Sequence, residues 1–246
     1  MINLKNITLV AVASTQHRAT LEALKYSSKE INFSEILFFS EINPCPTDNF
    51  FRYIKTRKFN NISEWGEFII FELHKYISTP YIILIHADGF IVNPYKWSNE
   101  FLKYDYIGAP WPLPKDTVSF RDANGGICRV GNSVSLRSKK ILELPSKLNL
   151  KWKNFILNIP HEDGFLCAQH KILLEQNGIK FAPLKTAVLF AREYRIPENV
   201  GVEPFIFHKW KGENKKFPNF TYQKFHNKIF NLIKKFIMKF NSDENI

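Results

Sequence analysis

The stretch Tyr81-Ile82-Ile83-Leu84-Ile85-His86-Ala87-Asp88-Gly89-Phe90 decides the fold that this sequence predicts. Its first five residues are apolar and mostly β-branched, which is typical of a strand buried on both faces at the centre of a parallel sheet. The run ends at His86, and ligands of open α/β sheets bind beyond the carboxyl ends of the strands. Asp88 therefore lies where a carboxylate would hold a metal or a phosphate-bearing ligand, although an Asp-Gly pair also serves as an ordinary turn.

Upstream of this strand, predicted strands and helices alternate in the order typical of an α/β domain. The expected elements are strands at 7–13 and 35–39, a helix at 20–26, and a helix at 61–77. Thr15 or Thr20 is the expected cap of the first helix. Asn61 and Glu64 form a capping box at the start of the second helix. The segment 43–57 contains two prolines and is predicted to be a loop.

Downstream of Asp88 the alternation breaks, and the region 93–114 is rich in proline and is predicted to consist of loops. A strand is expected at 129–138, leading into a helix that begins at Lys139. Another helix is expected to begin at the run Pro160-His161-Glu162-Asp163, because two acids in the first turn suit the helix dipole. It is expected to end at Gly178, and 180–190 is expected to be extended chain.

The turn after the first strand, with the sequence Ser14-Thr15-Gln16-His17-Arg18, is a candidate nucleotide site. Hydroxyl groups and free backbone N–H groups at a strand-to-helix turn suit a phosphate. The sequence contains no G-x-G-x-x-G pattern and no P-loop, so neither a Rossmann dinucleotide site nor a Walker phosphate site is indicated.

The composition is typical of a soluble globular protein, with 45% hydrophobic and 23% charged residues in a chain of 246. No apolar run approaches the roughly 20 residues needed to span a bilayer, and the N-terminus lacks the pattern of a signal peptide. The three cysteines have no metal-type spacing, which favours reduced thiols and a cytoplasmic location. The formal net charge of +11 favours an acidic partner: nucleic acid, anionic lipid or a phosphorylated substrate.

The C-terminal segment differs in character from the rest, and the expected division is a domain at 1–210 and a basic segment at 211–246. From Pro218 onward, apolar residues share one helical face while lysines gather on the other. A basic amphipathic helix is typical of a segment that lies on an anionic membrane surface, here the inner face of the membrane. The alternative is a terminal helix that packs on the domain with its lysines in solvent.

Four short motifs in this order resemble the GT-A class of nucleotide-sugar glycosyltransferases, and more closely a group of glycosyltransferase-like proteins without a characterised activity. They are His86-Ala87-Asp88-Gly89-Phe90, Tyr104-Asp105-Tyr106-Ile107-Gly108-Ala109-Pro110-Trp111, the stretch 130–138, and His161-Glu162-Asp163. The resemblance covers about residues 5 to 210. It implies a GT-A-like, Rossmann-like α/β fold with a mixed sheet flanked by helices, followed here by the C-terminal basic helix.

The resemblance implies an inverting, metal-dependent transfer of a sugar from a UDP-linked donor to a glycan or a lipid-linked acceptor. Asp88 and His208 would ligate Mn²⁺ or Mg²⁺ that stabilises the leaving diphosphate. His86 replaces the first aspartate of the D-x-D pattern of GT-A enzymes and is a further candidate ligand. Asp163 is the candidate base for the acceptor hydroxyl, and Glu162 would orient that base or the acceptor.

The remaining roles that the resemblance implies concern the two substrates. Nucleotide binding is assigned to Ser14, Thr15, Arg18 and Ala87, and sugar or acceptor binding to Gly131, Asn132, Trp111 and His161. The third family motif departs from its pattern, because Ser133-Val134 replaces Gly-Gly-Phe. Trp111 is equally compatible with a core position.

Two other functions remain compatible with the sequence. Positive charge with interleaved aromatic residues is found in modules that bind nucleic acid. However, no nucleic-acid-binding motif is present, and nucleic acid is not an expected partner. A transferase fold that has lost its activity and serves as a scaffold is the other alternative, because fold alone does not establish activity.

Overall fold

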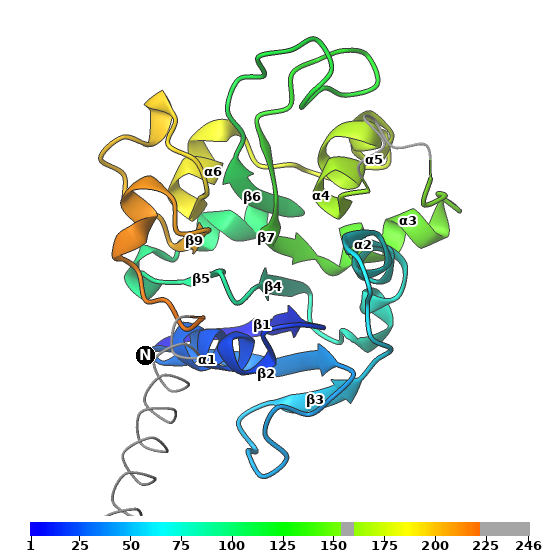
Figure 1. The fold of residues 1–246 in the computed structure, drawn as a ribbon. Coiled ribbons are helices and arrows are strands. Elements are labelled where there is room, and N and C mark those ends of the chain that lie inside the picture. The colour runs from blue at the N-terminus through cyan, green and yellow to red at the C-terminus, as the bar shows by residue number, and fades with distance from the viewer. Residues whose placement is uncertain (154–159, 222–246) are drawn as a thin grey trace, which may run out of the picture.

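The computed structural model describes residues 1–153 and 160–221, and a six-stranded sheet forms its centre (Figure 1). The strand order is β3-β2-β1-β4-β7-β6. The strands are β1 (Ile2–Val12), β2 (Ile31–Ser40), β3 (Arg52–Lys55), β4 (Tyr81–Ile85), β6 (Tyr106–Pro110) and β7 (Val130–Ser138). The first four pair in parallel, whereas β7 runs antiparallel to both β4 and β6. The sheet is therefore mixed, as the expected fold class requires.

The central strands are apolar on both sides because both faces of the sheet are covered. Leu9 of β1 and Ile83 of β4 belong to one buried cluster, and their neighbours Val10 and Ile82 belong to another on the opposite face. All four side chains are fully buried. This double burial is the reason that β4 has an unbroken apolar run rather than an alternating pattern.

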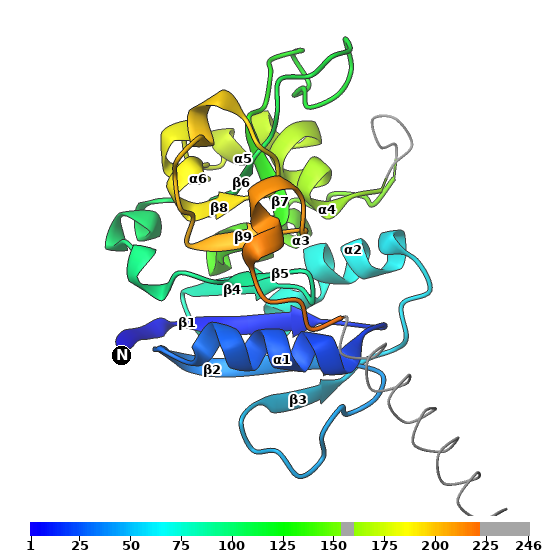
Figure 2. The same cartoon turned by 60° about the vertical axis from the view of Figure 1, so that its left-hand side comes forward.

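Helices cover both faces of the sheet. Figure 2 shows α1 (His17–Ser28) lying along β1 and β2, and its buried residues join the cluster that contains Leu9. On the other face, α2 (Ile62–Phe71) packs against α3 (Lys139–Lys147). Asn61 caps α2 as expected, because its side chain accepts a hydrogen bond from the backbone N–H of Glu64.

The expected helix at 20–26 begins earlier, at His17, and its cap differs from the expectation. Gln16 is the cap residue, with a left-handed φ of 53° and no hydrogen bond from its side chain. The hydroxyl of Thr20 instead donates to the carbonyl of Gln16 one turn back. Neither Thr15 nor Thr20 caps this helix.

A second, smaller sheet packs on the face that α1 covers. It has the order β5-β9-β8 and consists of β5 (Gly89–Ile91), β9 (Ile206–His208) and β8 (Ala191–Arg192). The strands are short, but their aromatic side chains are fully buried, and the rings of Phe90 and Phe207 lie 4.8 Å apart between centroids. This sheet joins a segment near residue 90 to two segments more than 100 residues further along the chain.

Three predicted segments differ in the structure. The region 93–114, predicted to consist of loops, includes β6 (Tyr106–Pro110), which pairs with β7 in the large sheet. Residues 43–57 include the edge strand β3, which pairs with β2 on one side only and so needs no apolar alternation. Residues 180–190 include α6 (Leu184–Phe190), so the expected extended chain ends at Pro183. Pro183 is the cap of α6, and Ala187, Val188 and Phe190 are the buried residues of this helix. In all three cases tertiary packing decides the local structure.

The helix expected to begin near His161 is interrupted. It comprises α4 (Glu162–Gly164), one π-helical turn at Phe165–Gln169 and α5 (Lys171–Gln176). Gly178 follows α5 with a φ of +78°, which agrees with the expected end of this helix.

Residues after the small sheet remain attached to the domain as far as they are described. Asn214 is buried and donates hydrogen bonds to the carbonyls of Arg192, His208 and Lys209. The expected basic amphipathic helix falls mostly on residues 222–246, which lie outside the described residues, and so does its expected contact with a membrane. Among the described residues, no helix has the length and apolarity needed to cross a membrane.

We expect Gly108→Ala to destabilise the fold strongly. Gly108 lies at the irregular point of the β6–β7 pairing, and an added Cβ would fall 1.8 Å from the carbonyl oxygen of Gly131. Two backbone segments would have to separate, at a cost of about 3 kcal/mol in free energy of unfolding. Urea unfolding measures this cost. Gly164→Ala is the control, because its added Cβ would meet no atom closer than 4.0 Å.

Candidate functional site

The small sheet brings three polar side chains together at one of its ends. In the antiparallel pairing of β5 with β9, Gly89 lies opposite His208, so Asp88 lies beside the end of β9. The backbone N–H of Lys209 donates to the carbonyl of Asp88 at 2.7 Å. Because β8 runs parallel to β9, Glu193 leaves β8 at the same end. Segments that are far apart in the sequence thus meet at one point.

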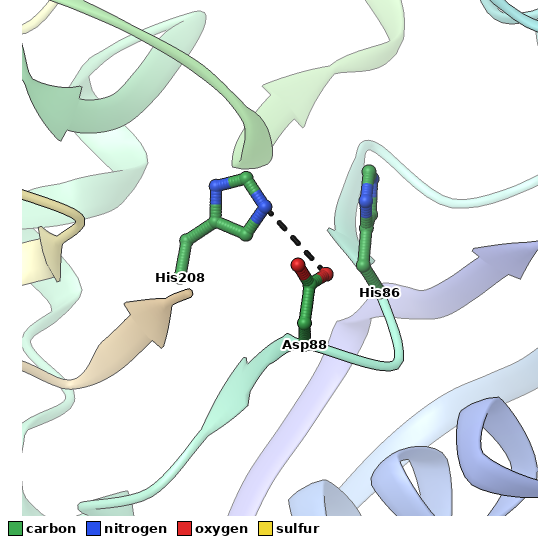
Figure 3. Close-up of side chains that lie close together, drawn as sticks. All are labelled: His86, Asp88 and His208. Carbon is green, nitrogen blue, oxygen red and sulfur yellow. Dashed lines mark ion pairs between the residues drawn. The ribbon is translucent and has the colours of Figure 1, made fainter. Parts of the chain in front are cut away.

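His86, Asp88 and His208 form a compact cluster there (Figure 3). One ligand atom from each lies within 4.8 Å of the other two. His208 Nε2 and Asp88 Oδ1 are 3.7 Å apart, which is too long for a hydrogen bond. A tight turn holds His86 in place, because its backbone N–H donates to the carbonyl of Gly89 at 2.7 Å.

The residues of this cluster fit a divalent cation. His86 Nε2 is buried and has no hydrogen-bond partner among the described residues, so a nitrogen suited to a metal is left unsatisfied. Burial and the nearby His208 lower the pKa of His86 to about 4, which keeps its imidazole neutral near pH 7. One carboxylate with imidazole nitrogens is a donor set that Mn²⁺ accepts more readily than Mg²⁺.

Asp163, the predicted base, lies at the start of α4, and its carboxylate accepts hydrogen bonds from two backbone N–H groups. Its Oδ2 accepts a hydrogen bond from the backbone N–H of Asn132 at 3.1 Å, and its Oδ1 accepts one from Gly164 at 2.8 Å. Burial, and then the negative charge of Glu162, raise the pKa of Asp163 to about 6. A carboxyl group with this pKa exchanges a proton close to neutral pH.

Glu162 has a different environment from its neighbour Asp163. Its side chain is fully buried, and its Oε1 forms an ion pair with Arg137 Nη2 at 2.8 Å, also fully buried. Its Oε2 accepts a hydrogen bond from the Ser133 hydroxyl at 3.2 Å. Glu162 thus connects the start of α4 to β7 inside the protein.

Asn132 links Glu193 to Asp163, the predicted base. Its φ of 105° is rare for a residue with a side chain, and its side chain and backbone are bonded on several sides. The side-chain amide donates to Glu193 Oε2, the amide oxygen accepts from the backbone N–H of Val134, and the backbone N–H donates to Asp163. A movement of Asn132 would therefore disturb its hydrogen bonds to Asp163 and to Glu193.

Glu193 is a site residue that sequence reasoning did not identify. Its side chain is 6% exposed, and its Oε1 accepts from Lys209 Nζ at 2.5 Å. Burial alone would raise the pKa of Glu193, but the proximity of His208 and Lys209 outweighs it and lowers the pKa to about 2. The residue follows a strand of two residues, which leaves no sequence pattern that would have marked it.

A cavity of about 490 Å³ opens onto most of these groups, but not onto the buried pair of Glu162 and Arg137. The cluster of His86, Asp88 and His208 lines the cavity, together with Glu193, Asn132 and Asp163. Further lining residues are Ile62, Trp111, Val118, Ser119, Phe120, Arg121, Ser133, His161, Gly164, Phe165, Ala168, Gln169, Tyr194 and Lys209. One part of the cavity wall thus carries charged side chains such as Asp88 and Glu193, and another part carries aromatic side chains such as Trp111 and Phe120.

The residues predicted to bind sugar lie in or next to this cavity. Trp111 lines it although the side chain is 5% exposed, and the ring packs on Phe120 at 4.9 Å between centroids. Gly131 is next to Trp111, and a Cβ at Gly131 would fall 1.9 Å from the indole. The glycine thus makes room for Trp111. His161 is exposed at the cavity wall.

The residues predicted to bind the nucleotide are not among the cavity-lining residues of the described chain. Ser14 Oγ accepts a hydrogen bond from the backbone N–H of Phe59 at 2.8 Å. Thr15 and Arg18 are exposed, and Ala87 is half-buried in the turn between His86 and Asp88. Their assignment to the nucleotide stays a prediction.

Comparison with known proteins gives a family and a fold. A family model described as a protein of unknown function, DUF5672, matches residues 50–208. No curated protein matches the chain in sequence.

Solved glycosyltransferase structures resemble this structure. The galactosyltransferase LgtC in complex with donor and acceptor sugar analogs has a TM-score of 0.52 at 10% identity, covering 88% of this chain and 94% of LgtC. An active-site mutant of LgtC has a TM-score of 0.51 at 10% identity, covering 90% and 95%. A glycosyltransferase involved in glycosylation of the major capsid of PBCV-1 has a TM-score of 0.48 at 12% identity, covering 85% and 95%. The LgtC structures confirm the GT-A-like fold class.

We expect Glu162→Gln to act mainly on stability. The substitution leaves the Arg137 guanidinium buried without a counter-charge, which costs about 3–5 kcal/mol in free energy of unfolding. Urea unfolding measures it. Glu143→Gln is the matched control, because it removes a partly exposed surface pair with Lys147, which costs at most about 1 kcal/mol. Equal losses in the two variants would contradict a structural role for the buried pair.

Proposed function

The chain belongs to the DUF5672 family of proteins of unknown function, and we propose that it is a metal-dependent glycosyltransferase that uses a nucleotide-sugar donor. One observation carries the proposal: a single cavity contains a cluster suited to a divalent cation and a carboxyl group whose pKa is raised to about 6. The fold shared with a galactosyltransferase supports the same conclusion. Leaving-group stabilisation and proton removal are the two demands of sugar transfer.

The leaving diphosphate is proposed to lie at Asp88, His208 and His86. A divalent cation held by these residues would supply positive charge to offset the charge that develops on the diphosphate. Lys209 is half-buried at the same part of the cavity, and its ammonium group forms an ion pair with Glu193 there. These residues bind and orient the donor so that its sugar extends toward Asn132.

Asp163 is proposed to remove the proton from the acceptor hydroxyl. In a single displacement the attacking oxygen and the leaving diphosphate lie on opposite faces of the sugar, so the anomeric configuration is inverted. The ionised carboxylate of Asp163 has a pKa of about 6, close enough to neutrality to accept a proton and release it again. Hydrogen bonds from two backbone N–H groups fix its orientation.

Glu162 is proposed to position this base without touching a substrate. The ion pair with Arg137 fixes the first residue of α4, and Asp163 is the next residue in the chain. Interactions that hold a catalytic group within a fraction of an ångström of its working position contribute to the rate through orientation.

The donor is proposed to be UDP-linked and the acceptor to be a glycan or a lipid-linked glycan. The aromatic wall of the cavity supports a sugar-binding role, because Trp111 and Phe120 offer flat apolar surfaces of the kind on which sugar rings stack. A cytoplasmic enzyme of surface glycan synthesis, in contact with a membrane through its C-terminal segment, is the setting in which these proposals agree.

We expect the wild-type protein to hydrolyse a UDP-sugar slowly in the presence of Mn²⁺ and to stop when EDTA removes the metal. A panel of UDP-sugars with detection of released UDP identifies the donor. Asp88→Asn is expected to weaken Mn²⁺ binding about 10-fold or more, because the only carboxylate of the cluster is lost.

Asp48→Asn is the control for this measurement, because Asp48 pairs with Lys25 in α1 and is not among the cavity-lining residues. Wild-type protein that binds neither UDP nor Mn²⁺ in calorimetry would overturn the proposed function and favour a scaffold. NMR analysis of the first product formed from an α-linked donor tests inversion, which predicts a β-linked product.

We expect kcat/KM for transfer to rise with pH until about pH 6 and to level off above it. Only the ionised Asp163 accepts a proton, and its pKa is about 6. Asp163→Asn is expected to lower the rate by about 10²- to 10⁴-fold and to remove this pH dependence. Full transfer activity in the variant would exclude Asp163 as the base.

Stability measurements separate this effect from unfolding. Because folding raises the pKa of Asp163 from 3.8 to about 6, its contribution to stability is complete below pH 3.8 and is lost as pH rises through about 6. Asp163→Asn removes that dependence. Relative to wild type, the variant is therefore expected to gain free energy of unfolding between pH 4 and pH 7, as urea unfolding would report.

A further inference from the structure

Glu193 occupies a position that its sequence context does not explain. It is a carboxylate buried to 6% exposure in the wall of the cavity, and both of its oxygens are engaged. Oε1 accepts from Lys209, and Oε2 accepts from the side-chain amide of Asn132. A carboxylate held this firmly keeps a fixed orientation toward the other groups beside it.

One of those groups is the imidazole of His208. Its two nitrogens face two different carboxylates: Nε2 lies 3.7 Å from Asp88 Oδ1, and Nδ1 lies 3.7 Å from Glu193 Oε2. Nδ1 is buried and has no hydrogen-bond partner within normal distance among the described residues. Glu193 is therefore the negative group that the inner nitrogen of His208 faces.

The position of a proton on a neutral imidazole depends on what each nitrogen faces. An N–H directed at a carboxylate is favoured, whereas a lone pair directed at the same carboxylate is repelled. Asp88 faces Nε2 at the same distance, but its side chain is 39% exposed and its charge is screened by water, whereas Glu193 is 6% exposed. Glu193 therefore has the stronger influence, and it favours the tautomer of His208 with hydrogen on Nδ1. The lone pair of Nε2 is then directed into the cluster with Asp88 and His86.

We propose that Glu193 is a positioning residue that fixes the orientation and tautomer of His208, so that Nε2 is the free ligand of the metal cluster. This inference rests on the metal dependence of the proposed function. A carboxylate behind a histidine ligand changes metal affinity by about 10- to 100-fold in metal sites generally.

The ion pair between Glu193 and Lys209 has a counterpart that serves as a control. Lys216 Nζ and Glu203 Oε1 are also 2.5 Å apart, but both side chains are close to half exposed. Glu203→Gln removes the same charge and the same kind of pair without altering the cavity. A difference between Glu193→Gln and Glu203→Gln therefore reports the position of Glu193 and not the loss of a Lys–Glu pair.

The first test uses the full-length wild-type protein without metal. Long-range ¹H–¹⁵N NMR of ¹⁵N-histidine-labelled protein distinguishes the two tautomers, and His208→Ala assigns the signals. The proton of His208 is expected on Nδ1. A proton on Nε2 would overturn the inference, regardless of the Mn²⁺ affinities measured in the second test.

The second test titrates Mn²⁺ into the wild type and the two variants and follows the free ion by electron paramagnetic resonance. Glu193→Gln is expected to bind Mn²⁺ about 10- to 100-fold more weakly, and Glu203→Gln to bind like the wild type. Glu193→Asp keeps the charge and is expected to recover part of the affinity. Thermal unfolding of each variant identifies the folded fraction to which the affinities refer.

The outcomes separate this inference from the proposed function. Wild-type binding that Glu193→Gln leaves unchanged would overturn the role of Glu193 and leave metal dependence intact. A wild type that binds no Mn²⁺ would contradict both.

Discussion

The antiparallel pairing of β5 with β9 is the constraint on which the candidate site depends. Each strand has three residues, and strands this short do not persist by their hydrogen bonds alone. Phe90, Phe205 and Phe207 are fully buried in the core cluster that the small sheet shares with α1, and each buried aromatic side chain contributes about 1.5–3 kcal/mol. A slip of one residue would turn these rings toward the opposite face, so their burial fixes the register. That register places His208 beside Asp88.

The adjacent acids Glu162 and Asp163 lie in different environments, one inside the protein and one at the cavity. Glu162 enters the protein and forms an ion pair with Arg137, whereas Asp163 lines the cavity and accepts hydrogen bonds from the backbone N–H groups of Asn132 and Gly164. The charge of Glu162 then raises the pKa of Asp163 further. One buried ion pair therefore fixes the start of α4 and also makes the neighbouring carboxylate a stronger base. Neighbouring carboxyl groups with diverging environments are a common arrangement in acid–base catalysis.

Much of the large sheet could be predicted from the sequence, because burial on both faces leaves a visible apolar run. The strands at 7–13, 35–39, 81–85 and 129–138 were all expected, and each forms part of the sheet. The edge strands β3 and β6 and the helix α6 were missed because neighbours decide their structure: each of these strands is paired on one side only in the large sheet, and α6 packs against β6. Local patterns contain no information of this kind.

The candidate site was predicted in its parts but not in its connections. Asp88 could be placed from the end of its strand, whereas His208 entered through family resemblance, since 120 residues separate the two. Glu193 and Arg137 could not be identified, because a buried charge is recognised by its partners and the partners of both are remote in sequence. Tertiary contacts between distant segments create the electrostatic properties of the site.

The replacement of an aspartate by His86 changes the charge of the cluster and, with it, the logic of binding. Asp88 is the one carboxylate of the cluster and His86 is neutral near pH 7, while the charge of Glu193 is balanced by its pair with Lys209. A divalent cation at such a cluster keeps a net positive charge, which the oxygens of a diphosphate neutralise. In the proposed function, cation and diphosphate would therefore strengthen each other's binding, and this coupling would be reciprocal by thermodynamic necessity. In a cluster with a second carboxylate, the cation would be held more firmly without the diphosphate, and the two ligands would depend on each other less.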